Sequence, residues 1–282
     1  MNNLLSRRVS SLRKYLNYSW DLSDMGRIRA TLPTVAYEAL DAPAEKVTPW
    51  SILKLCDSID QSYFWSTPRE PGGPLYTPMF YILNLSLDIN KAFYDMNTPK
   101  FPMTMESRVK YMKRSSCCLE KTLSHPETNQ TYVTSMCINV NVDHETRKPT
   151  AFEDWWKAKY CFPTEGERQE FLIPDKPDVN VFTSDHRVHF SDTDENGHAN
   201  FTAYVRYCSD SFHENVLAGR YGKGLDVYAV GLQRMEVTFH NECNVGDRLT
   251  ICSWQDDQLF NTFYFEVRHG DVLTLTAMMK YY

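Results

Sequence analysis

The sequence predicts an α+β protein in which one plan, a long helix followed by a mostly antiparallel sheet, occurs twice. Two observations support this. Each half of the chain holds one segment with helical apolar spacing, and several strand-like runs accompany each helix. A stretch rich in proline and charge, CFPTEGERQEFLIPDKPDVN, is typical of a linker. We therefore expect a basic N-terminal segment at 1–25, a first unit at 26–160, a linker at 161–180 and a second unit at 181–282.

The helix of the first half is predicted from about Thr48 to Trp65. Thr48 is a suitable N-cap, and Pro49 suits the first helical position because its missing N–H would have no partner there. The apolar face of this helix is formed by Trp50, Ile52, Leu53, Leu55, Cys56, Ile59 and Phe64.

Strands of the first half are predicted around MFYILNLSL and over 132–142, where apolar residues alternate with Asn139 and Asn141. SHPETNQ, just before the second of these, indicates a turn between long strands. DHETRKPTAFEDWW closes the half with another turn.

The second half repeats this order. HRVHF is a short strand candidate, and a helix is predicted from Asn200 to Leu217, with Gly219 and Gly222 able to end it. Its apolar side chains are Phe201, Tyr204, Val205, Cys208, Phe212 and Val216. Further strands are expected at 233–239, 248–254, 259–268 and 272–281, with RHGD as a hairpin turn between the last two.

Composition narrows the function classes. The 282 residues are 42% hydrophobic, which suffices for a core, and no apolar run is long enough to span a membrane. A formal net charge of -6 argues against a nucleic-acid binder. The eight cysteines are scattered without metal-ligand spacing, and we expect no metal, nucleotide or redox cofactor. His186 and His189, three apart on a predicted strand, would point to opposite faces, so they indicate no metal site.

The N-terminal segment MNNLLSRRVSSLRKYL is basic, with no acidic residue before Asp21. A basic surface helix and a mitochondrial targeting segment both fit this pattern. Because no secretory signal is evident, we expect a reduced intracellular protein, cytoplasmic or alternatively in the mitochondrial matrix.

The most informative stretch is FSDTDENGHANFTAY at 190–204, which places acids, an amide and a histidine just before a predicted helix. Free N–H groups at a helix start stabilise negative charge, such as a carbonyl becoming an oxyanion. A turn with a capping residue explains the same residues without any catalysis. An EF-hand loop is excluded because its twelfth position, counted from Asp192, is Ala203 rather than Glu.

The pattern Ser-Asp-x-Asp-x-Asn-x-His-x-Asn-x-x-x-Tyr resembles the active-site segment of the acyl-ACP thioesterases, which are hotdog-fold enzymes. The matching residues are Asp192, Asp194, Asn196, His198, Asn200 and Tyr204. FHNEC, with Glu242 and Cys243, resembles the family's later Glu-Cys pair, and SMCINVNVDHETRKPTAFED resembles the end of its first unit. The chain departs from the family at Gly197, where the family has Gln, and at Phe201, where it has a second Asn.

The resemblance covers about 30–282 and implies two tandem hotdog units, each a long central helix wrapped by an antiparallel sheet, with one catalytic site in the second. It implies a thioester hydrolase that releases a fatty acid from acyl-ACP or acyl-CoA, with Asp194, Asn196, His198 and Glu242 as the catalytic set. In these roles His198 and Asn196 polarise the carbonyl or position water, and Glu242 is the general base. Asp194 orients the pair or attacks as a nucleophile.

Residues that touch substrate or support the site are expected to be Asp192, Gly197, Asn200, Phe201, Tyr204 and Cys243. Cys243 is interpreted as a core residue rather than as the nucleophile. The basic residues Arg108, Lys110, Lys113 and Arg114 could meet an anionic carrier, or could simply form a solvated strand face. A homodimer is possible. The alternatives are a non-catalytic acyl- or lipid-binding hotdog protein, and a hotdog hydratase or dehydratase.

Overall fold

The computed structural model describes residues 19–21, 27–35, 39–41, 46–63, 67–68, 75–76, 79–95, 97, 100–143, 145–160, 171, 173–194, 197–221, 225 and 231–282. It divides into two compact units. The N-terminal unit comprises 1–36, 54–83 and 95–168, and the C-terminal unit comprises 37–53, 84–94 and 169–282. The basic segment that we interpreted as a surface helix or a targeting signal lies almost entirely outside the described residues, as does the whole first half of the predicted linker, 161–170.

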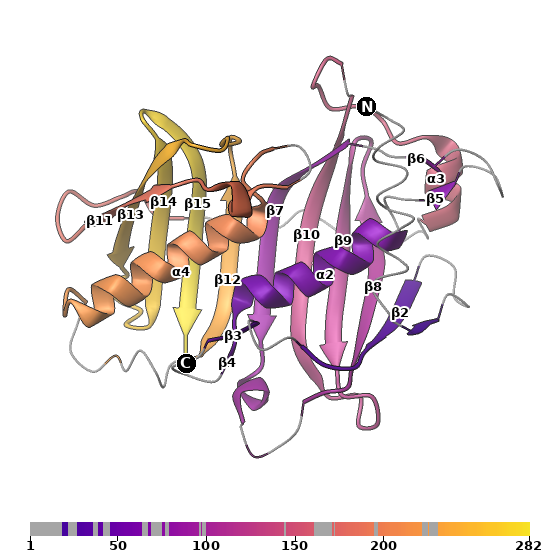
Figure 1. Cartoon of the computed structure of the whole chain (residues 1–282), viewed down its shortest axis with the longest axis horizontal. Coiled ribbons are helices and arrows are strands. Elements are labelled where there is room, and N and C mark those ends of the chain that lie inside the picture. The colour runs from indigo at the N-terminus through magenta and orange to yellow at the C-terminus, as the bar shows by residue number, and fades with distance from the viewer. Residues whose placement is uncertain are drawn as a thin grey trace. The chain divides into compact units, whose positions relative to one another are not determined.

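Strands dominate the N-terminal unit (Figure 1). They pair antiparallel in the order β1 (Ser19–Asp21), β2 (Arg27–Leu32), β8 (Met103–Met112), β9 (Ser116–Ser124) and β10 (Thr131–Val142). The first half of β7 (Met79–Ile89) follows, and β5 (Thr67–Pro68) and β6 (Leu75–Tyr76) form a separate small pair. α2 (Pro49–Tyr63) contributes its residues from Lys54 onward, and α3 (Asp154–Tyr160) is a short helix.

The core of this unit follows from strand alternation. Along β8, buried and half-buried residues strictly alternate, because successive side chains of a strand point to opposite faces. The buried face includes Ser107, whose hydroxyl donates to the Asp60 carboxylate on α2 at 3.1 Å. Lys121 Nζ lies 2.5 Å from the other oxygen of Asp60. An ion pair therefore lies inside the core, where the charges of Asp60 and Lys121 neutralise each other.

The C-terminal unit is built from the second half of β7 and five further strands. Their order is β7, β12 (Leu232–Phe239), β15 (Val272–Tyr281), β14 (Thr262–His269), β13 (Arg248–Gln255) and β11 (Phe182–Arg187), with all described pairings antiparallel. The short elements are β3 (Leu40–Asp41), β4 (Lys46–Val47), η2 (Lys91–Tyr94) and η3 (Phe190–Asp192).

Helix α4 (Phe201–Leu217) crosses this sheet and contacts β13 and β11 (Figure 1). Phe212 on its inner face is fully buried and stacks on Tyr281 of β15 with ring centroids 4.2 Å apart. The ring of Phe263 of β14 meets the ring of Phe212 edge-on, with centroids 4.8 Å apart. Because burying aromatic side chains removes a large apolar area from water, this cluster fixes the helix on the sheet.

Most predicted elements are confirmed within one or two residues, including both long helices and the hairpin at Gly270, which has a φ of 57°. Two strands differ. β14 begins at Thr262 rather than at 259, because the Asp256 carboxylate accepts the N–H groups of Gln258 and Leu259 and holds a turn there. β11 ends at Arg187, since Phe190 enters the 3-10 turn instead of continuing the strand.

Among the described residues, no helix has the length and hydropathy required to cross a membrane.

Candidate active site

The polar stretch that precedes α4 forms a closed loop rather than an extended turn. The Asp194 N–H donates to the His198 carbonyl at 2.9 Å, and the Gly197 N–H donates to the Asp194 carbonyl at 3.1 Å. Gly197 has a φ of 80°, a conformation that L-residues with a side chain rarely adopt. The backbone therefore doubles back, bringing Asp194 and His198 to the same end of the loop.

Helix α4 begins directly after this loop. The Asn200 side chain accepts the Thr202 N–H at 2.9 Å and is the N-cap, so the helix begins within one residue of the predicted start. The Asn200 N–H itself donates to the Asp192 carbonyl at 2.7 Å. Hydrogen bonds from Asn200 in both directions therefore fix the start of the helix directly after the loop that carries His198.

A second segment meets this loop and supplies Glu242. The Ala199 N–H donates to the Cys243 carbonyl at 2.8 Å, and His198 forms a β-bridge with Asn244. Through this contact His198 Nδ1 lies 3.4 Å from a carboxylate oxygen of Glu242. Both side chains are partly exposed, so a solvent molecule or a substrate can reach them. Two of the four predicted catalytic residues, 44 positions apart in sequence, are therefore adjacent in the structure.

Asp192 lies behind the loop as a buried carboxylate. It accepts the His189 N–H at 2.8 Å and pairs with Arg206 of α4, while His186 Nε2 lies 3.9 Å away. Burial alone would raise the pKa of the Asp192 carboxyl, but these donors and the Arg206 charge hold that pKa below its ordinary value. Asp192 is therefore an anion that ties the start of the loop to α4.

His186 completes this group from β11. Its ring lies against Tyr207 with centroids 3.9 Å apart. Burial lowers the pKa of His186 and outweighs the opposing effect of the Asp192 carboxylate, while Arg206 lowers the pKa further. Sequence reasoning missed Arg206 and this use of His186, because a pairing between a loop, a strand and the second turn of a helix leaves no periodic signal.

Cys243 is fully buried, and burial raises the pKa of its thiol. A thiol in this state is a poor nucleophile, which agrees with its interpretation as a core residue. Tyr204 is also buried, and its ring meets Phe239 edge-on at 6.0 Å, so it packs the helix onto β12. Phe201 is half-buried at the first turn of α4. Asn196 lies outside the described residues.

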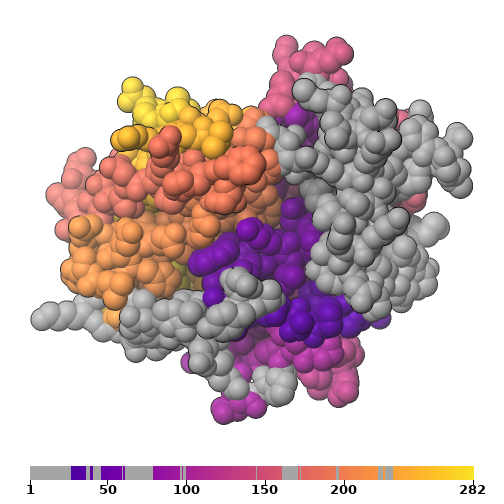
Figure 2. Space-filling view, in the orientation of Figure 1, coloured from indigo at the N-terminus to yellow at the C-terminus, as the bar shows by residue number. Residues whose placement is uncertain are grey.

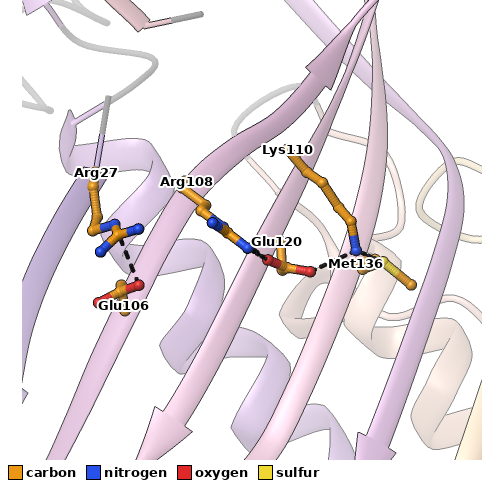
Figure 3. A network of polar contacts seen from close by, with 6 residues as sticks. All are labelled: Arg27, Glu106, Arg108, Lys110, Glu120 and Met136. Carbon is orange, nitrogen blue, oxygen red and sulfur yellow. Dashed lines mark hydrogen bonds and ion pairs between the residues drawn. The ribbon is translucent and has the colours of Figure 1, made fainter. Parts of the chain in front are cut away.

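The basic residues noted near the first hairpin divide into two groups. Arg108 and Lys110 both point to Glu120 on the neighbouring strand, at 2.5 and 2.6 Å, and Arg27 pairs with Glu106 beside them (Figure 3). Lys113 and Arg114 are exposed in the turn that follows β8. Two of the four residues of the predicted basic run therefore share one carboxylate within the sheet, and the other two lie in an exposed turn. The described residues also hold no cluster of potential metal ligands.

One family model matches the C-terminal part of the chain, and several solved structures are similar to nearly all of it. Residues 175–279 match the family model described as the acyl-ACP thioesterase C-terminal domain. The solved 12:0-ACP thioesterase from Umbellularia californica is similar with a TM-score of 0.66 and 11% identity, covering 91% of this chain and 97% of that one. The putative oleoyl thioesterase from Lactobacillus plantarum gives 0.64 and 14%, covering 94% and 97%.

An acyl-ACP thioesterase from Bacteroides thetaiotaomicron gives a TM-score of 0.61 at 14% identity, covering 92% of this chain and 98% of that one. At such identities these likenesses establish a shared fold across nearly the whole chain. The search of curated proteins found no match.

Proposed function

We propose that the chain releases a fatty acid from an acyl-ACP or acyl-CoA thioester at the loop preceding α4. The match of residues 175–279 to the acyl-ACP thioesterase C-terminal domain supports this proposal. The family match makes the chain a thioester hydrolase. The acyl carrier, the acyl chain and the residue roles are our proposal. The observation that supports the site most directly is the 3.4 Å contact between His198 and Glu242, which two separate loops bring together.

In this proposal Glu242 accepts a proton from a water molecule, and the resulting hydroxide attacks the thioester carbonyl carbon. His198, Asn196 and the N–H groups near the start of α4 stabilise the oxyanion. The carbon–sulfur bond then breaks, and the proton held by Glu242 passes to the leaving thiolate. The products are a fatty acid and the free carrier thiol. Asp194 orients the loop through its backbone contact with His198.

A covalent route is the alternative role for Asp194. Its carboxylate would attack the carbonyl carbon and expel the thiolate, and water would then hydrolyse the mixed anhydride. Rapid quenching during the first turnover distinguishes the routes. A peptide containing Asp194 that carries the acyl mass, or one heavy oxygen from labelled water, supports the covalent route. The absence of an acylated peptide at every quench time, together with no heavy oxygen in Asp194, supports direct attack by water.

Each unit is proposed to be a hotdog, with α2 and α4 as the respective central helices. The similarity of fold to three thioesterases over more than nine-tenths of the chain supports this. The N-terminal unit has no counterpart of the acid-Asn-His stretch, so a single catalytic site per chain is part of the proposal.

The test is thiol release from a panel of acyl-CoA and acyl-ACP substrates of different chain lengths. Wild type is compared with Asp194→Asn, His198→Ala and Glu242→Gln, and circular dichroism confirms that each variant is folded. Activity in wild type that is lost in the variants supports the proposed site. A wild-type protein that binds acyl chains but hydrolyses no thioester would instead support the acyl-binding alternative.

A further inference from the structure

Two arginines stand directly opposite each other at the sheet edge beside the candidate active site. Arg187 ends β11 and Arg248 begins β13, and the strand register pairs them. Side chains of directly opposed residues in an antiparallel pair point to the same face, and like charges placed so are destabilising. Both side chains are exposed, while the adjacent Leu249 is buried on the other face. The pair therefore presents two positive charges to solvent from one face of the sheet.

Neither guanidinium has a carboxylate partner among the described residues, which sets this pair apart. The other arginines on strands of the described sheet, together with Arg206 of α4, each pair with an acid; these are Arg27, Arg29, Arg108, Arg206, Arg234 and Arg268. The nearby acids have other partners. Asp185 accepts from the Thr250 hydroxyl, and Asp247 accepts the Asn244 N–H and faces His269 at 3.5 Å. Neither of these two carboxylates forms an ion pair with Arg187 or Arg248.

The pair is coupled by the backbone to the segment that carries Glu242. The Val188 N–H donates to the Asp247 carbonyl at 2.9 Å, and the Gly246 N–H donates back to Val188 at 2.8 Å. Nη2 of Arg187 lies over Gly246, 4.0 Å from where a Cβ would stand. That turn begins at Cys243, directly after Glu242, and its Asn244 bridges His198.

Exposed apolar side chains accompany the charges. Phe190 follows β11 and is 84% exposed, and Val245 in the facing turn is 52% exposed. Figure 2 shows the segment around η3 beside the first turns of α4, on the surface of the C-terminal unit. Phe190 follows Arg187 by three residues and therefore adds an exposed apolar side chain to the same end of β11.

We propose that Arg187 and Arg248 bind the phosphate ester of the pantetheine arm that carries the acyl group. This inference rests on the proposed thioesterase function, since acyl-ACP and acyl-CoA share that phosphate. Guanidinium groups are suited to it because their planar N–H forks bind phosphate oxygens in pairs. Backbone hydrogen bonds connect the strand ends that carry the pair to the segment after Glu242, and in this proposal the arm is anchored there while its thioester end reacts.

The experiment compares four thioesters of one acyl chain: acyl-pantetheine, acyl-phosphopantetheine, acyl-CoA and acyl-ACP. The variants are Arg187→Gln, Arg248→Gln and the double variant. We expect kcat/KM for the three phosphate-bearing substrates to fall about tenfold per arginine, with kcat little changed, because a charge-assisted hydrogen bond of binding is lost. The acyl-pantetheine rate should stay as in wild type. Arg187→Lys should lose less kcat/KM than Arg187→Gln, because lysine keeps the positive charge but not the planar pair of N–H donors.

Arg268→Gln is the matched control, because it removes one positive charge from a neighbouring strand where Glu266 already pairs with it. It should leave the ratio between phosphate-bearing and phosphate-free substrates unchanged. An equal fall on acyl-pantetheine in the double variant would overturn the inference. A loss confined to acyl-CoA or to acyl-ACP, with acyl-phosphopantetheine unaffected, would also contradict the inference, because all three substrates carry the same phosphate.

Direct binding separates failure of this inference from failure of the proposed function. Titration calorimetry of the full chain measures 4′-phosphopantetheine and pantetheine as ligands, without any turnover. Phosphate-dependent binding that disappears in the double variant supports the site even if every thioester proves inert. Binding that does not depend on the phosphate, or that persists in the double variant, contradicts it.

Discussion

The two long helices of the chain are each associated with a buried carboxylate paired to a cation, but the two pairs have different surroundings. Asp60, on α2, meets Lys121 where both side chains are at most 6% exposed. Asp192 precedes α4 and is equally buried, yet its partner Arg206 is 36% exposed and the loop with His198 follows at once. An ion pair with both partners buried stabilises the packing between a helix and a sheet. An ion pair with one partly exposed partner can also hold a reactive loop in place.

The largest effect is expected at the site itself. His198→Ala and Glu242→Gln should each lower kcat by about 10²–10⁴-fold on any accepted thioester, because each removes a group proposed to act in proton transfer or charge stabilisation. The measurement is steady-state thiol release with thermal unfolding as a check of folding. Retention of more than a tenth of the wild-type rate by either variant would contradict the proposed site. The ion pair before α4 would then have no catalytic role to distinguish it from the pair on α2.

The buried pair of the N-terminal unit should respond to removal of one partner. Lys121→Met leaves Asp60 buried without its cation, and we expect a loss of about 3–5 kcal/mol in the free energy of unfolding. Asp60→Leu combined with Lys121→Met should recover most of that loss, since no charge is left uncompensated. Urea denaturation measures both variants. If the double variant were as unstable as the single one, the pair would stabilise the folded state by more than the neutralisation of each other's charge.

Asp192 should link stability and activity. Asp192→Asn removes the charge that pairs with Arg206, and we expect a loss of about 1–3 kcal/mol together with reduced kcat. Arg206→Met should behave similarly if the contact positions the loop. The readout that separates positioning from mere stability is kcat under conditions where all variants are fully folded. An unchanged kcat in both variants would show that Asp192 and Arg206 stabilise the fold without positioning the loop.

The pH dependence of the same variant follows from the depressed pKa of Asp192. A carboxyl whose folded pKa lies below its unfolded value of about 3.9 contributes stability above that pH, and this contribution is lost as the pH falls through the folded pKa. The stability difference between wild type and Asp192→Asn should therefore be constant at neutral pH and shrink below about pH 4. Urea titrations at a series of pH values test this, and a difference that grows toward acid would contradict the ionised state.

The smallest effect is expected at Gly197. With a φ of 80° and no atom within 4 Å of a Cβ, Gly197→Ala meets no clash but adopts an unfavourable backbone conformation, costing about 1–2 kcal/mol. Gly197→Asn should lose less, because Asn tolerates positive φ. Thermal unfolding compares the two. Equal losses would show that the loop changes conformation instead of keeping this angle.

Local pattern was sufficient for much of the architecture. The helix with Asn200 as its cap, the helix beginning at Pro49 and the hairpin at Gly270 were predictable because capping, proline placement and glycine turns act over a few residues. The strand assigned from 259 was wrong at its start, since Asp256 captures the neighbouring N–H groups in a turn. HRVHF was likewise placed too late, because β11 covers 182–187.

The sequence by itself determined which residue types precede α4. Acids, an amide and a histidine lie close together along the chain, so this grouping does not depend on the fold. Only the tertiary structure decided that His198 meets Glu242, that Arg206 and His186 surround Asp192, and that Arg187 faces Arg248. The physical reason is that these contacts depend on strand register and helix placement. Those are fixed by burial of apolar side chains throughout a unit, and no local spacing records them.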